Sequence, residues 1–261
     1  MKLDKEQIDF WEDNSYLIFR GLFAKEIKNI AKWIEEVKMW PDTNEKWLKF
    51  YEMDDPDKLS RIENFVPFHH DLAEIINGNS MKEIVGILMG EAPVLYKDRI
   101  NFKPSGGGAH AAHQDGVAYE SGSLRQFEMD SIPYISLLIS VDPATRQNGC
   151  FEVVKDWEIS KLDILPMERP YPKYPSFSKI TKEVEDKLNW VQLETKPGDA
   201  ILFTERLPHR SGINLSSSSR RIMYGVYNPL REGDKRETYF RDKRNNINDP
   251  RYMVGNPHAP K

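Results

Sequence analysis

Cysteine is nearly absent from this sequence, which has a single one, Cys150, among 261 residues. A lone cysteine forms no disulfide within its own chain, so no disulfide framework supports the fold. Cys150 lies in an expected strand, where a small buried residue is a commoner role for cysteine than a nucleophile. This composition is compatible with a reducing compartment, and we expect a cytoplasmic protein.

Long apolar runs and an excess of basic charge are also missing. No apolar segment approaches the ~18–20 residues of a membrane-spanning helix, and the charged start MKLDKEQIDFWEDN lacks the apolar stretch of a signal peptide. Lysine and arginine number 37 against 41 aspartate and glutamate residues, which gives a net charge of −4. The sequence therefore predicts neither a nucleic-acid nor a membrane partner, and it indicates no oligomeric state.

The chain is nevertheless long and apolar enough to build a sizeable core. Hydrophobic residues make up 39% and aromatic residues 11% of the sequence, and single all-β domains of this length are ordinary. We expect one domain over 1–261, with helical support in 1–92 and a β core in 93–228. The polar tail over 229–261 is expected at the surface.

Helical periodicity marks three segments of the N-terminal part, in which apolar residues recur at i, i+3 and i+4. These expected helices cover 4–13, 24–38 and 81–89. For the third, Ser80 and Glu83 have the spacing of a capping box, and Gly90 is placed to end the helix.

Two further N-terminal stretches bear on possible sites. Residues 40–60 mix aromatic and charged side chains around two prolines, which predicts an irregular segment that could belong to a lid. His69 and His70 are adjacent, and adjacent side chains point apart in a strand or a helix, so they are poorly placed to chelate one ion. We interpret them as surface or capping histidines.

From residue 93 the sequence changes to short apolar runs separated by turns, which predicts strands. Together with an early one, the expected strands cover 16–19, 99–103, 134–141, 150–154, 200–203 and 220–227. Asn148-Gly149 is a hairpin signal. The polar segments 116–130 and 155–190 predict a loop and a lid over the site. Helices in front of such strands indicate an α+β fold, mainly β, built as an antiparallel barrel or sandwich.

The strand at 99–103 alternates polar and apolar residues. Arg99, Asn101 and Lys103 share one face, and Ile100 and Phe102 share the other. The polar face suits either a barrel interior that holds a charged ligand or a surface in contact with solvent. The sequence leaves these alternatives open.

Two histidines and one carboxylate, His113, Asp115 and His209, form a candidate metal set. On an extended segment His-x-Asp places both side chains on one face, and the third ligand can come from a strand folded against it. A 2-His-1-carboxylate set occupies one face of an iron(II) ion and leaves the other positions open. Metal ligands on two barrel strands point to a double-stranded β-helix, or jelly-roll, core.

Several motifs in a fixed order resemble the phytanoyl-CoA dioxygenase (PhyH) family over roughly residues 93–228. They are Arg99-Ile-Asn-Phe-Lys-Pro-Ser-Gly-Gly-Gly, His113-Gln-Asp115, Asn148-Gly-Cys-Phe-Glu-Val-Val154, Pro197-Gly-Asp199, and His209-x-Ser211-Gly-x-Asn214 followed by Arg220. The family consists of Fe(II)- and 2-oxoglutarate-dependent oxygenases. The resemblance implies a cupin-like double-stranded β-helix and a reaction that consumes O₂ and releases succinate and CO₂.

The resemblance also implies roles for particular residues. Iron would be held by the His113, Asp115 and His209 set. Arg220, eleven residues after the last ligand, would bind the distal carboxylate of 2-oxoglutarate with Ser211 beside it. A planar arginine suits such a carboxylate better than lysine does. Arg221 points to the opposite face. Weaker candidates for the cofactor site are Asn101, Arg99, Tyr134 and Ser136.

Asp115 bears on the type of reaction. Related halogenases replace the carboxylate ligand by a small residue, so its presence here predicts hydroxylation of a C–H bond. The alternative is a non-catalytic or zinc-binding cupin-like protein, in which we would expect part of the set of ligands and cofactor residues to be lost. Family members often carry a Pro-Gly-Ser-His turn after the Asn-Gly-Cys strand, whereas Lys155-Asp-Trp-Glu158 stands here, so the family's substrates do not carry over directly.

The substrate is expected to be a small metabolite, polar or zwitterionic, because the predicted lid is polar. Aromatic side chains could form walls around a quaternary ammonium group. The candidates are Tyr119, Tyr134, Trp157, Tyr171 and Tyr174. Arg125 and Arg146 could meet a carboxylate, phosphate or phosphonate. For each aromatic residue, packing beneath a loop is the commoner role.

Overall fold

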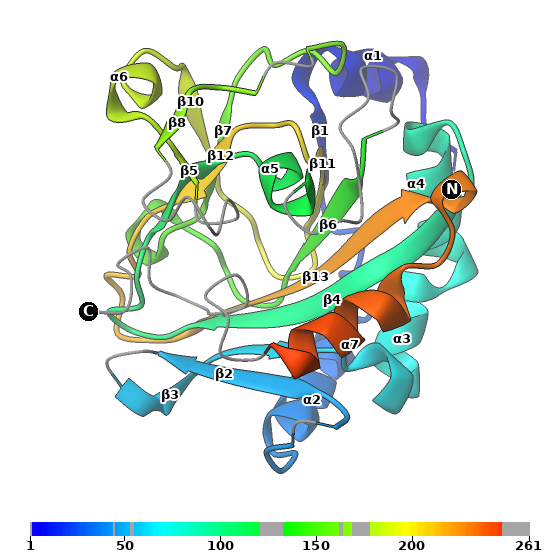
Figure 1. Ribbon diagram of the computed structural model, residues 1–261, viewed down its shortest axis with the longest axis vertical. Coiled ribbons are helices and arrows are strands. Elements are labelled where there is room, and N and C mark those ends of the chain that lie inside the picture. Colours follow the sequence, from blue (N-terminus) through cyan, green and yellow to red (C-terminus); the bar gives the residue numbers. More distant parts are fainter. Residues whose placement is uncertain are drawn as a thin grey trace.

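Two antiparallel β-sheets form the centre of the protein in the computed structural model (Figure 1). The structure describes residues 2–43, 45–52, 55–120, 133–161, 164–168 and 178–246. The larger sheet has the order β1-β11-β6-β13-β4-β3-β2. Its strands are β1 (Tyr16–Phe19), β2 (Leu48–Glu52), β3 (Asp55–Glu63), β4 (Pro93–Lys103), β6 (Ile135–Ser140), β11 (Ala200–Thr204) and β13 (Arg220–Pro229).

The smaller sheet has the order β10-β7-β12-β5 and packs against one face of the larger sheet. Its strands are β5 (His110–His113), β7 (Phe151–Val154), β10 (Trp190–Leu193) and β12 (His209–Ser211). A two-stranded ribbon, β8 (Met167–Glu168) and β9 (Lys179–Ile180), lies outside both sheets. This arrangement confirms the predicted double-stranded β-helix.

Alternation along the strands separates two apolar clusters. On β6, Leu137 and Ile139 belong to the cluster beneath the helices, whereas Leu138 belongs to the cluster between the two sheets. Successive residues of a strand point to opposite faces, so one fully buried strand serves both clusters. Phe151 of the smaller sheet and Phe203 of the larger sheet meet in the inner cluster, with ring centroids 4.8 Å apart.

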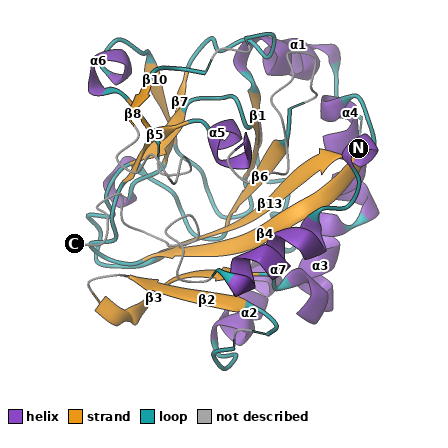
Figure 2. Ribbon diagram, in the orientation of Figure 1, coloured by secondary structure: helices purple, strands orange, loops and turns teal. Residues whose placement is uncertain are grey.

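Helices cover the outer face of the larger sheet (Figure 2). They are α1 (Lys5–Asn14), α2 (Ile27–Lys38), α3 (His70–Asn77) and α4 (Asn79–Met89), with the 3₁₀ turn η1 (Val66–Phe68) before α3. The predicted helices are confirmed with shifted ends, and α3 was not predicted. His69 caps α3, since its side chain accepts a hydrogen bond from the Leu72 amide, as expected for a capping histidine.

The capping box predicted at Ser80 is wrong. Helix α4 begins two residues earlier than predicted, at Asn79, and Gly78 is its N-cap, so Ser80 lies inside the first turn. A Cβ atom at position 78 would stand 2.3 Å from the Glu74 carbonyl oxygen. The close succession of two helices therefore selects glycine as the cap. The predicted end at Gly90 is confirmed, with a φ of 72°.

The irregular segment predicted over 40–60 is also wrong, because most of it forms the β2–β3 hairpin. Two register shifts interrupt this pairing, and they hide the alternation in the sequence. Strand β3 continues the larger sheet by pairing with β4, where Arg61 faces Asn101 and Glu63 faces Arg99. The hairpin thus places Arg61 and Glu63 beside Asn101 and Arg99, two residues of the polar face of β4.

The hairpin predicted at Asn148-Gly149 is a crossover instead. Strand β6 lies in the larger sheet and β7 in the smaller, so the two do not pair. Between them, the 3₁₀ turn η2 (Arg146–Asn148) ends at Gly149, whose φ of 71° favours glycine. The sequence correctly predicts a turn at Asn148-Gly149. A turn motif does not determine, however, whether the strand that follows joins the same sheet.

The segments predicted as covers are partly regular. The loop expected over 116–130 begins as helix α5 (Asp115–Glu120), and 121–132 lies outside the described residues. The region 155–190 contains the β8–β9 ribbon and helix α6 (Lys182–Glu185), while 162–163 and 169–177 are not described. Its role as a lid stays a prediction.

The tail expected at the surface over 229–261 is corrected for its first part. The 3₁₀ turn η4 (Leu230–Glu232) is followed by α7 (Arg236–Asn245), which lies across β4 (Figure 1). Phe240 and Lys243 of this helix are buried. Residues 247–261 lie outside the described part of the chain. Among the described helices, none has both the length and the apolar character needed to cross a membrane.

Candidate active site

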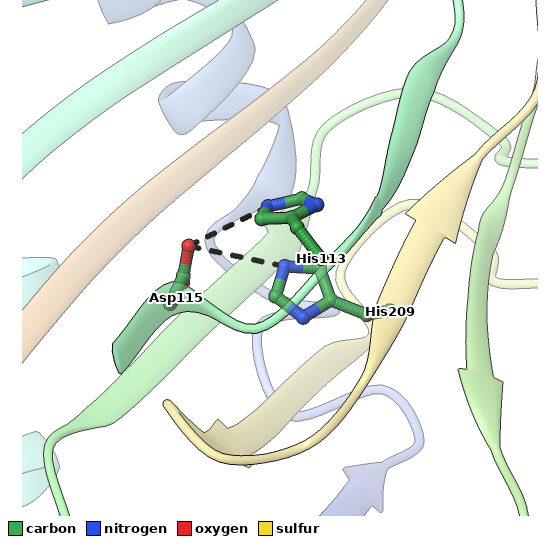
Figure 3. A group of neighbouring side chains, drawn as sticks. All are labelled: His113, Asp115 and His209. Carbon is green, nitrogen blue, oxygen red and sulfur yellow. Dashed lines mark ion pairs between the residues drawn. The ribbon is translucent and has the colours of Figure 1, made fainter. Parts of the chain in front are cut away.

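The three predicted metal ligands converge between the two sheets (Figure 3). His113 ends β5 and His209 begins β12, and the two stand opposite each other in the pairing of these strands. Asp115 is the first residue of α5, so the extended His-x-Asp geometry expected from the sequence is wrong. The turn into the helix nevertheless brings an Asp115 carboxylate oxygen 3.6 Å from Nε2 of His113 and 3.9 Å from Nε2 of His209.

Both histidines are oriented in the same way. Nδ1 of His113 lies 2.7 Å from the carbonyl oxygen of Ala111, and Nδ1 of His209 lies 2.9 Å from that of Leu207. A carbonyl only accepts hydrogen bonds, so it selects the tautomer with the proton on Nδ1. Nε2 then keeps its lone pair and faces the carboxylate, which is the usual arrangement of a metal-binding histidine.

The electrostatics of the group favour a metal ion. Burial and the neighbouring His113 ring lower the pKa of His209 to about 4, so its imidazole is neutral at pH 7. Burial raises the pKa of Asp115, but the two histidines and Lys97 outweigh that effect and hold the pKa well below its usual value. One carboxylate and two imidazoles, with ligand atoms all within 4.8 Å of one another, fit a divalent cation.

A pocket opens beside His113 and His209. Phe151 and Phe203 form an apolar wall, with ring centroids 5.2 and 5.1 Å from the His209 ring. Such a wall keeps water from one side of the metal position.

The polar face of β4 turns toward this pocket, which decides between the two alternatives left open by the sequence. Arg99, Asn101 and Lys103 all line it. The Arg99 guanidinium stacks 4.5 Å from the centre of the Tyr224 ring. Asn101 has a buried side-chain oxygen with no hydrogen-bond partner among the described residues. Unsatisfied buried polar atoms are costly in a native structure unless a ligand satisfies them.

Arg220 and Ser211 also line the pocket, as the family resemblance implied. The Arg220 guanidinium donates to the Gly149 carbonyl, and its buried Nε has no partner among the described residues. Arg221 points to the outer face, where it bonds Asp142 at 2.7 Å and Glu35 at 2.9 Å. The prediction that neighbouring arginines face opposite ways is therefore confirmed.

Other sequence candidates lie elsewhere. The Tyr134 ring packs 5.7 Å from that of Tyr96, and its hydroxyl donates to Glu232, so Tyr134 is not brought to the pocket. Ser136 is buried in β6 and is not a pocket residue either. Trp157 is buried in the inner apolar cluster, and Arg146 is exposed on η2. Arg125, Tyr171, Tyr174 and the side chain of Tyr119 lie outside the described residues.

Lys103 and Gln114 are among the residues near the site that were not predicted as site residues. Lys103 was placed on the right face of its strand, but the sequence did not show that it meets Ser211. Gln114 stands between two ligands, and its buried amide donates to the Arg206 carbonyl at 2.6 Å and accepts from the Leu165 amide at 2.9 Å. It thus links the ligand turn to the turn before His209 and to the 155–190 region.

Comparison with known proteins decides the family. The model of the phytanoyl-CoA dioxygenase (PhyH) family matches residues 11–222, which include every motif that carried the resemblance. The chain belongs to the phytanoyl-CoA dioxygenase family. It is 34% identical over 244 residues to the methylphosphonate hydroxylase of Gimesia maris, covering 93% of this chain and 87% of that protein. A 2-aminoethylphosphonate dioxygenase from an uncultured bacterium is also 34% identical, with 92% and 87% covered.

Solved structures of this family's fold agree. EctD from S. alaskensis, in a structure with 2-oxoglutarate and 5-hydroxyectoine, has a TM-score of 0.70 at 16% identity and covers 88% of this chain and 77% of its own. The epimerase SnoN, in a complex with Fe³⁺ and α-ketoglutarate, has a TM-score of 0.65 at 15% identity, with 87% and 83% covered. At such identities these likenesses concern the fold.

This phytanoyl-CoA dioxygenase family member is therefore an Fe(II)- and 2-oxoglutarate-dependent dioxygenase that uses O₂ to hydroxylate a small molecule. The enzyme prediction is confirmed, and the alternative of a non-catalytic or zinc-binding cupin-like protein is set aside. The residues that hold iron and 2-oxoglutarate are inferred from the geometry of the site.

Gln114→Leu is expected to weaken Fe(II) binding about tenfold, at the lower end of the ~10–100-fold effects of residues that support metal ligands. The change removes the amide that holds the turn between His113 and Asp115, without touching a ligand. Anaerobic titration with Fe(II) measures the affinity. Gln192→Leu, which alters an exposed amide on β10, is the control. A folded Gln114→Leu protein with the affinity of the wild type would contradict this positioning role.

Proposed function

We propose that His113, Asp115 and His209 hold Fe(II), and that Arg220 with Ser211 binds the distal carboxylate of 2-oxoglutarate. The support is the convergence of the three ligand atoms and the position of a buried guanidinium in the same pocket. Arg220 makes no ion pair with any described residue, whereas Arg221 next to it is fully paired. A buried guanidinium without a carboxylate suits an anionic ligand.

The residues around the metal position have different roles in the proposed reaction. Bound iron and 2-oxoglutarate supply the oxidising chemistry, with succinate and CO₂ as co-products. Asp115 and the two histidines would hold the ion, as a 2-His-1-carboxylate set does for iron(II). The carbonyl groups of Ala111 and Leu207 keep each imidazole in one tautomer. Phe151 and Phe203 keep water away from one side of the centre.

We further propose that the molecule hydroxylated is a small organophosphonate. The two relatives named for phosphonates match nearly the whole chain. Two cations of β4, Lys97 and Arg99, lie on the side of the strand that faces the metal position. Burial and the charge of Arg99 lower the pKa of Lys97 to about 7, although Asp115 and Glu63 oppose this shift. Crowded cations of this kind favour a phosphonate, whose oxygens accept bidentate arginine contacts.

Succinate release is the direct test of the substrate class. We expect methylphosphonate or 2-aminoethylphosphonate to stimulate it, and phosphorus NMR to show a hydroxylated product. The isosteric controls are the sulfonates, methanesulfonate for the first compound and taurine for the second. Stimulation by other small metabolites but by neither phosphonate would reject the proposed substrate class while leaving the oxygenase chemistry intact.

Arg99→Met is expected to raise the KM for the phosphonate about ten- to hundredfold, the range for loss of one charged hydrogen bond. The affinity for 2-oxoglutarate, measured anaerobically without substrate, should change much less. Arg20→Met is the matched control, because Arg20 pairs with Asp199 on the surface with a side chain 58% exposed. Equal losses of phosphonate and 2-oxoglutarate affinity in Arg99→Met would assign Arg99 to the cosubstrate.

A further inference from the structure

The C-terminal helix α7 brings an aromatic side chain to the cationic stretch of β4. The helix lies across this strand (Figure 1). The Tyr239 ring packs with its centroid 5.0 Å from that of Tyr96, and the Lys97 ammonium lies 5.6 Å from the centre of the Tyr239 ring. Lys97 and Arg99 are the two cations of the proposed phosphonate site. Helix α7 thus supplies a phenol beside that site.

Tyr239, Lys97 and Arg99 lie around a recess of the fold. All three side chains are half-buried, so each keeps some open space beside it. Burial is nevertheless the main cause that lowers the pKa of Lys97 to about 7 and raises the pKa of Tyr239 well above its usual value. The charge of Asp115 also acts on Lys97, and that of Arg99 acts on Tyr239. The phenol and the two cations therefore share one region with the carboxylate of the metal set.

The Tyr239 hydroxyl is held in a defined position. Lys243, one turn further along α7, donates to this hydroxyl at 3.5 Å and is itself fixed by an ion pair with Glu63. The adjacent Phe240 ring packs 4.9 Å from the tyrosine ring. A hydroxyl that accepts from an ammonium directs its own proton elsewhere, and the raised pKa keeps that proton on the oxygen. Tyr239 is thus a fixed, neutral donor beside two cations.

We propose that Tyr239 is a substrate-binding residue that donates a hydrogen bond to a phosphonate oxygen and makes the site selective for tetrahedral oxyanions. The inference rests on the proposed organophosphonate substrate and on the proposed role of Arg99. A phosphonate presents three oxygens in a tetrahedral arrangement, whereas a carboxylate presents two in a plane. A planar guanidinium matches two oxygens in a bidentate contact. The third oxygen then needs a donor from another direction, and α7 approaches β4 as a separate element.

Selectivity against carboxylates follows from this arrangement. A carboxylate bound by Arg99 has no third oxygen for the Tyr239 hydroxyl. A site built to hydrogen-bond a particular group discriminates against an analogue that lacks it, because the polar atoms of the site lose their partner. A sulfonate keeps the three oxygens with a lower negative charge. Among compounds with the same carbon chain, we therefore expect affinity to fall from phosphonate to sulfonate to carboxylate.

Steady-state succinate release at saturating 2-oxoglutarate tests this role. The compounds share one carbon chain: 2-aminoethylphosphonate is the substrate, and taurine and β-alanine are the competing sulfonate and carboxylate. The methyl series of methylphosphonate, methanesulfonate and acetate replaces them if methylphosphonate is the phosphonate that stimulates release. Each variant is first checked by thermal unfolding.

Tyr239→Phe keeps the ring and removes the hydroxyl. It is expected to raise the KM for the phosphonate and the inhibition constant of the sulfonate about tenfold, and to leave the inhibition constant of the carboxylate within about twofold. The affinity for 2-oxoglutarate, measured anaerobically without substrate, should also stay within about twofold. Tyr51→Phe is the matched control, because it removes a hydroxyl that bonds Asp42 on the β2–β3 hairpin.

The outcomes separate this inference from the proposal on which it rests. A wild-type KM for the phosphonate in Tyr239→Phe, together with an impaired Arg99→Met, overturns the role of Tyr239 and leaves the substrate class intact. An equal loss for the carboxylate, or for 2-oxoglutarate, also overturns it, because the hydroxyl then does not read the third oxygen. A wild-type enzyme that neither phosphonate stimulates rejects the proposed substrate class and, with it, this inference.

Discussion

Asp115→Ala is expected to abolish 2-oxoglutarate-dependent turnover and to leave a protein that no longer retains iron. Asp115 is the only carboxylate among the described residues that meets both His113 and His209. Its removal leaves only the two imidazoles, and burial keeps that of His209 neutral by lowering its pKa to about 4. The loss of Fe(II) affinity should exceed the ~10–100-fold that loss of a residue supporting the ligands costs.

Iron content after anaerobic dialysis and succinate release measure these two losses. Asp142→Asn is a control for removing a carboxylate, since Asp142 pairs with Arg221 on the outer face of the sheet. The fold should survive Asp115→Ala, because the ion pairs of Asp115 with described residues are those with the two histidine ligands. A variant that keeps iron and produces succinate at the wild-type rate would show that the three residues are not the metal site.

The metal-ligand set could be predicted because it depends on the types of the residues and on their order in the sequence. His113, Asp115 and His209 needed no knowledge of the sheet, and the resemblance to the phytanoyl-CoA dioxygenase family fixed their order. The local backbone at Asp115 was predicted wrongly, as a strand rather than the start of a helix. Metal binding depends on where ligand atoms converge, and more than one backbone path brings them together.

What the sequence could not show was which side chains meet across strands. Lys103 was known to share a face with Arg99, but its encounter with Arg220 depends on the register between β4 and β13. Lys103 and Arg220 do lie at the ends of expected strands, and this position was the one sequence feature that pointed to their pairing. Pairing between strands far apart in sequence is not encoded in either strand alone.

The C-terminal helix was missed for a different reason. Helix α7 is strongly polar, and only Phe240 and Lys243 are buried along it. Two inward residues, one of them charged, do not make an apolar stripe, so the 3.6-residue period is invisible. The helix is instead fixed by ion pairs, of which Arg236 with Asp98 and Lys243 with Glu63 reach into the protein.

Glu63→Gln is accordingly expected to lower the free energy of unfolding by about 3–5 kcal/mol at pH 7, the range for removing one partner of a buried ion pair. Glu63 is 2% exposed and accepts hydrogen bonds from Arg61, at 2.8 Å, and from Lys243. Without its charge, two cations remain enclosed between β3 and α7. Denaturant unfolding measures the change.

The pH dependence gives this prediction a second, independent readout. Burial raises the pKa of Glu63, but Lys243 and Arg61 outweigh it and lower the pKa from 4.5 to about 2. Since the folded pKa lies below the unfolded one, the stabilisation is complete above pH ~4.5 and is lost as the pH falls toward 2. The difference in the free energy of unfolding between wild type and Glu63→Gln should therefore shrink across that range.

The double variant Glu63→Gln/Lys243→Met should recover part of the lost stability, because it removes one uncompensated charge. Equal stability of the wild type and Glu63→Gln at pH 7 would mean that α7 is held by its apolar contact through Phe240 and not by this ion pair.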